Sequence, residues 1–398
     1  MYTGPNLTND DLVFGYDTGH GITNVNTATR FCPGQPTINL YTNSDFSNGG
    51  TGWTFGSWDG NISHAAATLV GPYGQIVSAR KLTVNAASSY SHFHQYNNSK
   101  YVSGSTYTTT AWVKGNGVFQ IKSHWGGNVS LTLTGEWQRI RQTVTATTST
   151  TGNFPYLAGE GLTVGTDCYV TMCQTELKGH ATPYVYSGAT TGSRTSTQSL
   201  IDLKRTRNID VANVSYDNAA QHVYDGSNDY IVSTALLVEG SQTFEAVFTP
   251  TANAHSPAAI LTNHSYTSPV ANFGINYIGG NKLGASIGYT DGTREYDSKQ
   301  TSGAVWVNGS NIAVHAVLAY NATLNQIKWY INGELDATHS LSATPNFQSV
   351  PVCSGRWVHN YGDYYYDGQV HLGKIYKKEL TASEIKSNFK AYKNRFNI

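Results

Sequence analysis

Apolar and polar side chains alternate through the segment Ile312–Leu341. The apolar ones stand at every second position, first at Ile312, Val314, Ala316, Leu318 and Tyr320 and then at Ile327, Trp329 and Ile331. Successive side chains of a β-strand point to opposite faces, so this pattern predicts strands with one buried face. Asn332-Gly333 suits a type I′ hairpin turn, in which both central residues have positive φ. The segment therefore predicts three antiparallel strands, whose buried face is best covered by a second sheet.

Short strands of the same kind, separated by turns rich in Gly and Thr, recur through nearly the whole chain. One runs through Tyr107, Thr109, Ala111 and Val113, and another through Phe244, Ala246 and Phe248. This pattern predicts β-sandwiches. Helical spacing is clear only near the end, where Ile385, Phe389, Tyr392 and Phe396 form one stripe after a capping box at Thr381–Glu384. We expect a short C-terminal helix docked on a sandwich, with an exposed partner-binding helix as the alternative.

Length and charge narrow the class of protein. The 398 residues are too many for one ordinary sandwich, so we expect two domains. Basic and acidic residues number 25 each, and this zero formal charge predicts no nucleic-acid or anionic-membrane partner. No apolar run approaches the ~20 residues of a membrane span. The first residues lack a basic start and an apolar core, so we expect no secretory signal.

The four cysteines are Cys32, Cys168, Cys173 and Cys353. They form no C-x-x-C pair and have no histidine at zinc-ligand spacing. Cys168 and Cys173 are an odd number of positions apart, so on a straight strand they face opposite sides. We interpret the cysteines as buried free thiols, which suits folding in a reducing cytoplasm.

Several stretches resemble the concanavalin A-like (laminin-G-like) jelly roll in the form found in bacteriophage virion proteins. They are the strand pattern around Asn332, the sequence VYDGSNDYI at Val223–Ile231, and the closing strand and helix at Gln369–Phe396. Asp11–Asp17 resembles the opening strand of the same proteins, whose usual continuation resumes only near Gln198. The resemblance implies one sandwich built from residues 1–36 and 187–398, with another domain inserted near its start.

The intervening residues 37–186 resemble a jelly-roll carbohydrate-binding module. Matching stretches occur in the family's order, at Asn39–Phe46 with Gly52-Trp53, Ser105–Lys114, Gly135–Arg139, Asp167–Glu176 and Ala181–Tyr184. We therefore expect an all-β fold of two β-sandwich (jelly-roll) domains, a concanavalin A-like lectin fold plus an inserted carbohydrate-binding-module-like fold, with a short C-terminal helix. Ser187–Thr197, rich in Gly, Ser and Thr, is predicted to be the return linker.

The carbohydrate-binding-module resemblance also implies a structural calcium ion near the opening and closing strands. Asp45 and Asp167 stand at the matching positions, and Ca²⁺ prefers such oxygen ligands. The glutamate that is typical beside the first of them is Ser47 in this chain. No other cofactor is implied, and none is required.

Sugar-binding proteins commonly place aromatic rings against the apolar faces of pyranoses. The candidates for this role in the inserted domain are Trp53, Trp58, Tyr73, His92, His94, Tyr96 and Trp125. Trp112 and Trp137 match core positions of the family and are excluded. His92 and His94 would share a strand face with Tyr90 and Tyr96. This cluster has three possible interpretations. It forms a glycan-binding face, it supplies two ligands of a metal site, or its side chains have ordinary structural roles.

The tyrosine-rich segment Arg356–Tyr366 is predicted to be a long loop before the closing strand. Its candidates for contact with a partner or a glycan are Trp357, Tyr361, Tyr364, Tyr365 and Tyr366, since tyrosine offers a large contact area at low entropic cost. Side chains of an extended segment alternate sides, so we expect at least one of the last three rings to face outward. The alternative is a loop that folds on its own rings.

The sequence predicts no enzymatic activity. Glycosidases use two carboxylates that face each other across the scissile bond. Glu295 with Asp297, and Glu334 with Asp336, match part of the Glu-x-Asp-x-x-Glu strand of laminarinase-type enzymes, but both pairs lack the last acid. We interpret both as chance matches. The sequence also contains no Gly-x-Ser-x-Gly elbow and no phosphate-binding loop.

The leading hypothesis is a non-enzymatic structural and adhesion component of a bacteriophage virion, in a fibre, the baseplate or the capsid decoration. It would present lectin-like domains to host-surface glycans, contact other virion proteins and form a homo-oligomer. Assembly would take place in the bacterial cytoplasm, without a nucleic-acid partner or membrane insertion. The alternatives are a secreted glycan-binding module and a polysaccharide-degrading glycoside hydrolase.

Overall fold

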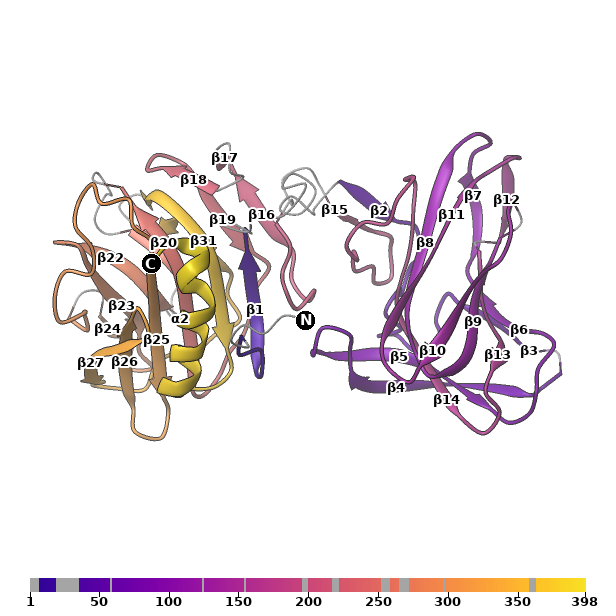
Figure 1. The fold of residues 1–398 in the computed structure, drawn as a ribbon, viewed down its shortest axis with the longest axis horizontal. Helices are drawn as coiled ribbons and strands as arrows, with labels where there is room; N and C mark the ends of the chain where they lie inside the picture. Colours follow the sequence, from indigo (N-terminus) through magenta and orange to yellow (C-terminus); the bar gives the residue numbers. More distant parts are fainter. Residues whose placement is uncertain are drawn as a thin grey trace. The chain divides into compact units, whose positions relative to one another are not determined.

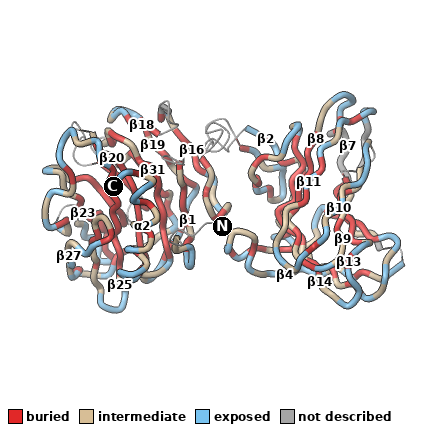
Figure 2. Tube along the Cα trace, viewed as in Figure 1, coloured by how far each residue is buried: buried red, intermediate tan, exposed pale blue. Residues whose placement is uncertain are grey.

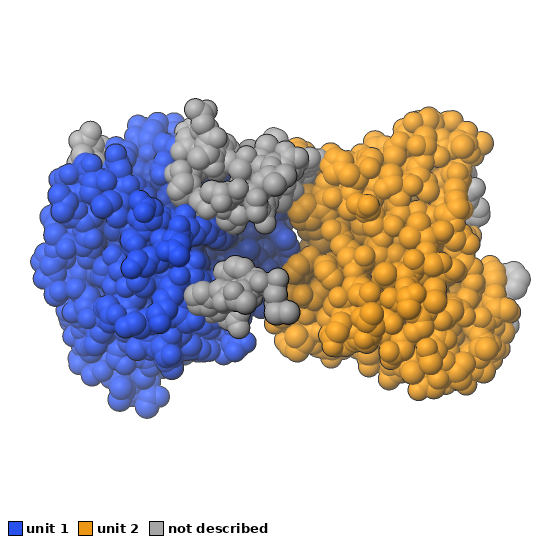
Figure 3. Space-filling model, in the orientation of Figure 1, with its two compact units in different colours: residues 1–33, 197–398 blue, residues 34–196 orange. Residues whose placement is uncertain are grey.

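The chain forms two compact units, one of residues 1–33 with 197–398 and one of residues 34–196 (Figure 1, Figure 3). The computed structural model describes residues 7–18, 36–57, 59–123, 125–153, 155–194, 200–216, 222–251, 258–264, 272–295, 298–357 and 363–398. The smaller unit is thus an insertion into the sequence of the larger one. In both units the most buried residues follow the strands (Figure 2).

The described strands of the larger unit form two main antiparallel sheets and a small hairpin. One sheet has the order β17 (Ser215–Tyr216), β18 (His222–Asp225), β31 (Asp367–Tyr376), β20 (Gln242–Pro250), β25 (Val314–Asn321), β26 (Gln326–Ile331) and β27 (Glu334–Ser340), with β1 (Leu12–Asp17) also beside β31. The other has the order β16 (Ile209–Ala212), β19 (Tyr230–Ser233), β28 (Val352–Ser354), β21 (Ala258–His264), β22 (Asn272–Gly279), β23 (Lys282–Gly288) and β24 (Arg294–Glu295). The hairpin pairs β29 (Arg356–Trp357) with β30 (Tyr364–Tyr365).

The three strands predicted within Ile312–Leu341 are β25, β26 and β27. Their antiparallel pairing confirms the prediction. Asn332 and Gly333 join the last two with φ values of 50° and 82°. A buried cluster fills the space between the two sheets and includes Phe244 of β20 and Phe273 of β22, whose ring centroids are 5.4 Å apart. The strand β1 pairs along β31, with Tyr16 opposite Gly373. The first described strand is therefore part of the larger unit's fold.

The outer face of the β1-containing sheet is covered by α2 (Ala382–Phe396), drawn in yellow in Figure 1. The predicted capping box is present: the Thr381 side chain accepts from Glu384 N, and the Glu384 side chain accepts from Thr381 N. Ile385, Tyr392 and Phe396 are buried against the sheet, as the helical stripe predicted. No helix among the described residues is long and apolar enough to cross a membrane.

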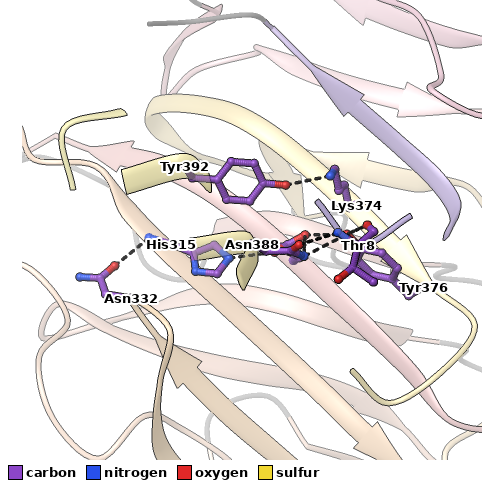
Figure 4. A network of polar contacts seen from close by, with 8 residues as sticks. Thr8, His315, Asn332, Lys374, Tyr376, Asn388 and Tyr392 are labelled. Carbon is purple, nitrogen blue, oxygen red and sulfur yellow. Dashed lines mark hydrogen bonds and ion pairs between the residues drawn. The ribbon is translucent and has the colours of Figure 1, made fainter. Parts of the chain in front are cut away.

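A buried polar cluster lies beneath α2 (Figure 4). Glu245 of β20 has no exposed surface. Its carboxylate accepts hydrogen bonds from His315 Nε2 at 2.9 Å, the Tyr376 hydroxyl at 2.8 Å and Asn388 Nδ2 at 3.0 Å. Asn388 is fully buried on α2, although the apolar stripe gave no sign of it. The helix is thus held by specific hydrogen bonds as well as by apolar contacts. 

The described strands of the smaller unit form two facing sheets and two short strand pairs. The first sheet has the order β10 (Val129–Thr134), β9 (Asn116–Lys122), β13 (Tyr156–Leu162), β6 (Ser91–His94) and β3 (Thr54–Ser57). The second has the order β11 (Gln138–Thr145), β8 (Thr106–Lys114), β14 (Asp167–Glu176), β5 (Ile76–Val84) and β4 (Ile62–Val70). The pairs are β12 (Thr150–Asn153) with β7 (Tyr96–Tyr101) and β15 (Gly192–Arg194) with β2 (Thr37–Asn39). A separate buried cluster lies between the two facing sheets.

An irregularity in β14 corrects the prediction that Cys168 and Cys173 face opposite sides. The register of β14 against β8 shifts between Thr171 and Gln174, and Met172 has a positive φ of 50°. The irregularity changes the alternation of side chains, so both cysteines lie in the same core cluster. These two and Cys353 are buried free thiols, as predicted, whereas Cys32 lies outside the described residues.

The described part of the predicted return linker, residues 187–194, packs on the smaller unit and is not an open linker there. Strand β15 pairs with β2 in the same unit. The Ser187 hydroxyl donates to Tyr41 O at 2.6 Å. Arg194 is buried, and its Nη1 donates to Pro183 O at 3.0 Å. Gly, Ser and Thr therefore serve here as small residues that pack closely against the sandwich.

Candidate functional site

The outer face of the sheet β10–β9–β13–β6–β3 gathers the two histidines that the sequence singled out. Phe93, between them on β6, lies in the core, so His92 and His94 point to the opposite face, where the surrounding side chains leave them only 8% and 7% exposed. Their rings stack with centroids 5.3 Å apart. Tyr156 of β13 packs edge-on at 4.5 Å from His92 and 4.9 Å from His94, and Tyr90 packs edge-on against His92 at 4.6 Å. We call these four side chains the histidine face.

Charged and amide side chains from neighbouring strands extend the histidine face. Tyr156 lies directly opposite Lys122 of β9, and residues in that relation share a face of the sheet. Lys122 forms an ion pair with Glu160 of β13, in which both side chains keep part of their surface exposed. Gln120 lies two positions before Lys122 on the same strand and so shares the face. The aromatic rings are therefore accompanied by a cation, an anion and an amide.

The electrostatic surroundings keep His92 neutral at pH 7. Burial lowers its pKa from the ordinary value of 6.5, the negative charge of Glu160 raises it, and the positive charge of Lys122 lowers it, with a net downward shift. A neutral imidazole carries one donor nitrogen and one acceptor nitrogen. This ring can therefore hydrogen-bond a hydroxyl group in either sense.

The close packing of His92 depends on a glycine in the neighbouring strand. Gly56 of β3 lies directly opposite His92. A Cβ at this position would come within 3.2 Å of the imidazole Cε1, so a larger residue would displace the ring. Phe55, the residue before it, points into the core and stacks on Phe93 at 5.8 Å. Phe55 thus packs in the core, whereas Gly56 leaves room for the His92 ring on the other face of the sheet.

Aromatic faces beside amide and charged groups suit a ligand that has both apolar and hydroxyl-bearing surfaces. Sugars have this character. The structure brings together His92 and His94 from the sequence candidates and adds Tyr156, Lys122 and Glu160, which sequence reasoning missed. Their strands meet only through tertiary pairing, and no local pattern marks that pairing.

The other tryptophan candidates of the inserted unit do not join the histidine face. Trp53 belongs to the core cluster and packs between Tyr41 and Phe46, with ring centroids 4.9 Å from each, so its prediction as a sugar-binding residue was wrong. Trp125 packs at 4.4 Å on Tyr101, which belongs to the core. Trp58 and the side chain of Tyr96 lie outside the described residues.

Tyr73 lies in the turn between β4 and β5 of the other sheet, away from the histidine face. Its ring packs edge-on against Trp112 at 5.4 Å, in a small cluster outside the main core that includes Met172 and Tyr184. Trp137 is half-buried, and its Nε1 donates to Val70 O at 2.8 Å. We excluded Trp112 and Trp137 as sugar-binding candidates because they match core positions of the family. Neither belongs to the main core cluster of this unit, so the prediction that they are core residues was wrong.

The tyrosine-rich segment of the larger unit is a hairpin in its described part, and the prediction of a long loop was wrong there. Trp357 pairs with Tyr364 across β29 and β30, and Trp357 is buried. Tyr366 is fully buried in the main core, 6.2 Å from the ring of Tyr224. Tyr364 and Tyr365 are half-buried, so among the described tyrosines of this segment they are the ones that can meet a partner. Tyr361 lies outside the described residues.

The two predicted calcium ligands are not brought together. Ser44, next to Asp45, accepts a hydrogen bond from Cys173 N at 2.8 Å. Asp167 begins β14 six positions before Cys173, which is roughly 20 Å along a strand. Asp167 instead forms an ion pair with Lys81 Nζ at 2.7 Å. No group of three or more His, Cys, Asp and Glu side chains in the described parts of the chain could hold a metal ion.

The described acidic residues from the partial glycosidase patterns have partners in the fold. Glu295 accepts a hydrogen bond from the Tyr289 hydroxyl at 2.9 Å, and Asp336 accepts two from Ser302 at 2.7 Å each. Glu334 forms an ion pair with Lys386 of α2 at 2.7 Å. Asp297 lies outside the described residues.

Comparison with known proteins finds a likeness for part of the larger unit. Residues 225–386 match a family model described as the concanavalin A-like lectin/glucanases superfamily. This part of the larger unit is thus similar to concanavalin A-like lectins and glucanases, and the described residues form an all-β fold apart from α2. A search of curated protein sequences finds no match to this chain.

Among solved structures, the chain is similar to the botulinum neurotoxin serotype D binding domain, with 14% identity and a TM-score of 0.37, over 48% of each chain. It is also similar to the Ruminococcus gnavus IT-sialidase CBM40 bound to α2,6-sialyllactose, with 19% identity and a TM-score of 0.33, over 38% of this chain and 84% of that one. The binding domain of botulinum neurotoxin DC in complex with rat synaptotagmin II has 16% identity and a TM-score of 0.39, over 48% and 49% of the two chains. The chain spans about half the length of these neurotoxin binding domains.

Proposed function

We propose that the chain is a non-enzymatic structural and adhesion component of a bacteriophage virion that binds glycans of the host surface. The histidine face carries the glycan-binding part of this proposal. His92, His94, Tyr156 and Tyr90 form one group of contacting rings, and Lys122 with Glu160 lies beside them. Because His92 and His94 are nearly buried, the exposed Tyr90 and the half-buried Tyr156 would stack on a pyranose ring. Lys122 and Glu160 would hydrogen-bond its hydroxyl groups.

The virion part of the proposal rests on the resemblance to bacteriophage proteins at Asp11–Asp17, Val223–Ile231 and Gln369–Phe396. The first and last of these segments contain β1 and β31, which pair with each other. We propose that the larger unit joins other virion proteins and further copies of this chain, in a particle assembled in the bacterial cytoplasm. The proposal includes no catalytic step, and it is supported by the internal hydrogen bonds of Glu295 and Asp336.

Binding of the purified full chain to an array of bacterial surface polysaccharides tests the glycan-binding part. Tyr156→Ser and His92→Ala should each weaken binding by at least about tenfold, because each removes a ring from the face. Tyr73→Ser is the matched control, since it removes a tyrosine from the β4–β5 turn, which belongs to the other sheet of the same unit. Binding lost in Tyr73→Ser and kept in Tyr156→Ser would place the site on the other sheet and contradict the proposal. Thermal unfolding of each variant separates a binding defect from loss of fold.

Detection of the chain in purified phage particles tests the virion part separately. We expect a fixed number of copies per particle and a defined position in a density map. Binding to glycans by a chain that is absent from particles would favour the secreted binding module. Release of reducing sugar from the bound polysaccharide would favour the glycoside hydrolase.

A further inference from the structure

A pocket of about 480 Å³ opens on the outer face of the larger unit's sheet. Its floor is one row across three neighbouring strands: Val223 of β18 and Thr249 of β20 both lie opposite Gln369 of β31. Directly opposite residues of antiparallel strands share a face, so these three side chains stand together. His371, two positions further along β31, stacks on Phe396 of α2 at 5.4 Å. The pocket therefore lies on the face that α2 covers, next to the end of the helix.

Two asparagines from separate segments complete the lining. Asn397 follows α2, and Asn311 precedes β25. Both have the left-handed backbone conformation, with φ values of 55° and 50°. The Asn397 backbone N–H donates to Lys393 O, which closes the helix. Because this cap uses the backbone, the amide side chain is not needed for it.

The chemistry of the lining is polar and uncharged. Among the described residues that line the pocket, none is acidic or basic, whereas three carry amides and two, Thr249 and Thr251, carry hydroxyls. Each amide side chain offers both donors and an acceptor. The Thr249 hydroxyl bonds His371 Nε2 at 2.8 Å and keeps capacity for a further hydrogen bond, because a hydroxyl has one donor and two acceptor sites.

This composition selects among classes of ligand. An anion would require a basic group or an array of backbone N–H donors, and a metal cation would require carboxylates. Neighbouring hydroxyls of a neutral sugar act as both donors and acceptors, which amides and hydroxyls can match. The volume lies within the range of about 300–1,000 Å³ that is usual for small-ligand sites.

We propose that this pocket binds a neutral sugar residue, at a site separate from the histidine face. Val223 and the edge of Phe396 supply its apolar surface, and the amides of Asn311, Gln369 and Asn397 bond the hydroxyls. The site lies in the lectin-like unit, whereas the histidine face lies in the inserted unit. The chain thereby carries two independent places for sugar.

The test uses the full chain with Tyr156→Ser, so that binding at the histidine face does not contribute. Titration calorimetry with maltotriose, cellotriose, mannotriose and lactose should find at least one ligand. Asn311→Gly with Asn397→Gly should then weaken that ligand by about 10- to 30-fold, because two amide hydrogen bonds are lost. Glycine retains the left-handed backbone at both positions. Asn281→Gly, at a φ of 58° in the β22–β23 turn, is the matched control and should bind like the parent.

Either of two results would overturn the assignment. The first is that none of the four neutral sugars binds, or that one binds equally well after the double substitution. The second is that sialyllactose, which is anionic, binds and loses affinity in the double variant while the neutral sugars do not. Thermal unfolding of the double variant, compared with Asn281→Gly, verifies that the fold is kept. Because the histidine face is tested with other variants, either site can fail while the other stands.

Discussion

Replacing Glu245 with glutamine tests how the buried polar cluster holds α2 on the sheet. The carboxylate accepts hydrogen bonds from three donor groups, on His315, Tyr376 and Asn388. Glutamine has nearly the same shape, but its NH₂ group would face at least one of these donors. The substitution also removes a negative charge near Lys374, which is 2% exposed and has its pKa lowered by burial. The change therefore breaks both the hydrogen bonding and the charge balance of the cluster.

These losses set the expected change in the free energy of unfolding. Removing one partner from a buried charged group costs about 3–5 kcal/mol in the free energy of unfolding. In a unit of this size each kcal/mol lowers Tm by about 2–4 °C, so Glu245→Gln should lower the transition of the larger unit by roughly 6–20 °C. Scanning calorimetry of the full chain measures this, with the transition of the smaller unit as internal reference. Glu334→Gln, in an exposed ion pair with Lys386, is the control and should shift Tm by less than about 2 °C.

The pH dependence gives a second measurement. Burial alone raises the pKa of Glu245, but the hydrogen bond and charge of His315 and the charge of Lys374 lower it, and the net shift is downward from 4.5. A carboxylate whose folded pKa is depressed stabilises the fold above its unfolded pKa, and that stabilisation is lost as pH falls through the folded pKa. The stability gap between wild type and Glu245→Gln should therefore narrow below about pH 4.3. Equal Tm values at pH 7, or a gap that stays constant down to pH 3, would refute this account.

Three further variants separate core residues from surface residues. Trp53→Ala should cost about 3–5 kcal/mol and lower the calorimetric transition of the smaller unit, because the ring is buried between Tyr41 and Phe46; a shift below about 2 °C would show that the ring contributes little to the core. Tyr364→Ser with Tyr365→Ser should leave Tm nearly unchanged and reduce assembly into particles, whereas Tyr366→Ser should lower Tm because that ring is fully buried. A double variant that loses stability and still assembles would mean that these rings only pack within the fold.

Features determined by residues close in sequence could be predicted. The turn at Asn332-Gly333 needs two residues that tolerate positive φ, and the chain places them between two alternating strands. The start of α2 needs Thr381 and Glu384 three positions apart, and both capping bonds form. Each of these signals is complete within a few residues, so no knowledge of the tertiary fold is required.

Features that depend on strand pairing could not be predicted. Tyr156 reaches His92 only because β13 pairs with β6, and the two strands are far apart in sequence. The irregularity at Met172 places both Cys168 and Cys173 in one core, although their spacing suggests opposite faces. From the sequence alone, Trp53 resembles an exposed sugar-binding ring, because its packing against Tyr41 and Phe46 is visible only in the fold. In each case the missing information is the register of distant segments.

The residues that make the inserted unit resemble a carbohydrate-binding module have a structural role. Glu176 is fully buried and accepts hydrogen bonds from Gln174 Nε2 at 2.9 Å, from Thr182 N and Oγ1 at 2.8 and 2.7 Å, and from Thr37 Oγ1 at 2.8 Å. These bonds join the end of β14 to the following turn and to β2. The motif therefore specifies how the chain closes the sandwich.

Ligand choice must then lie at positions that the motif leaves free. Tyr90, Tyr156 and Lys122 lie on the other sheet from β14, where their side chains can change without disturbing the closure around Glu176. Proteins that share the closing motif need not share a ligand, since fold and function are carried by different residues. A test of the proposed glycan binding should therefore be guided by the histidine face and by the pocket beside α2.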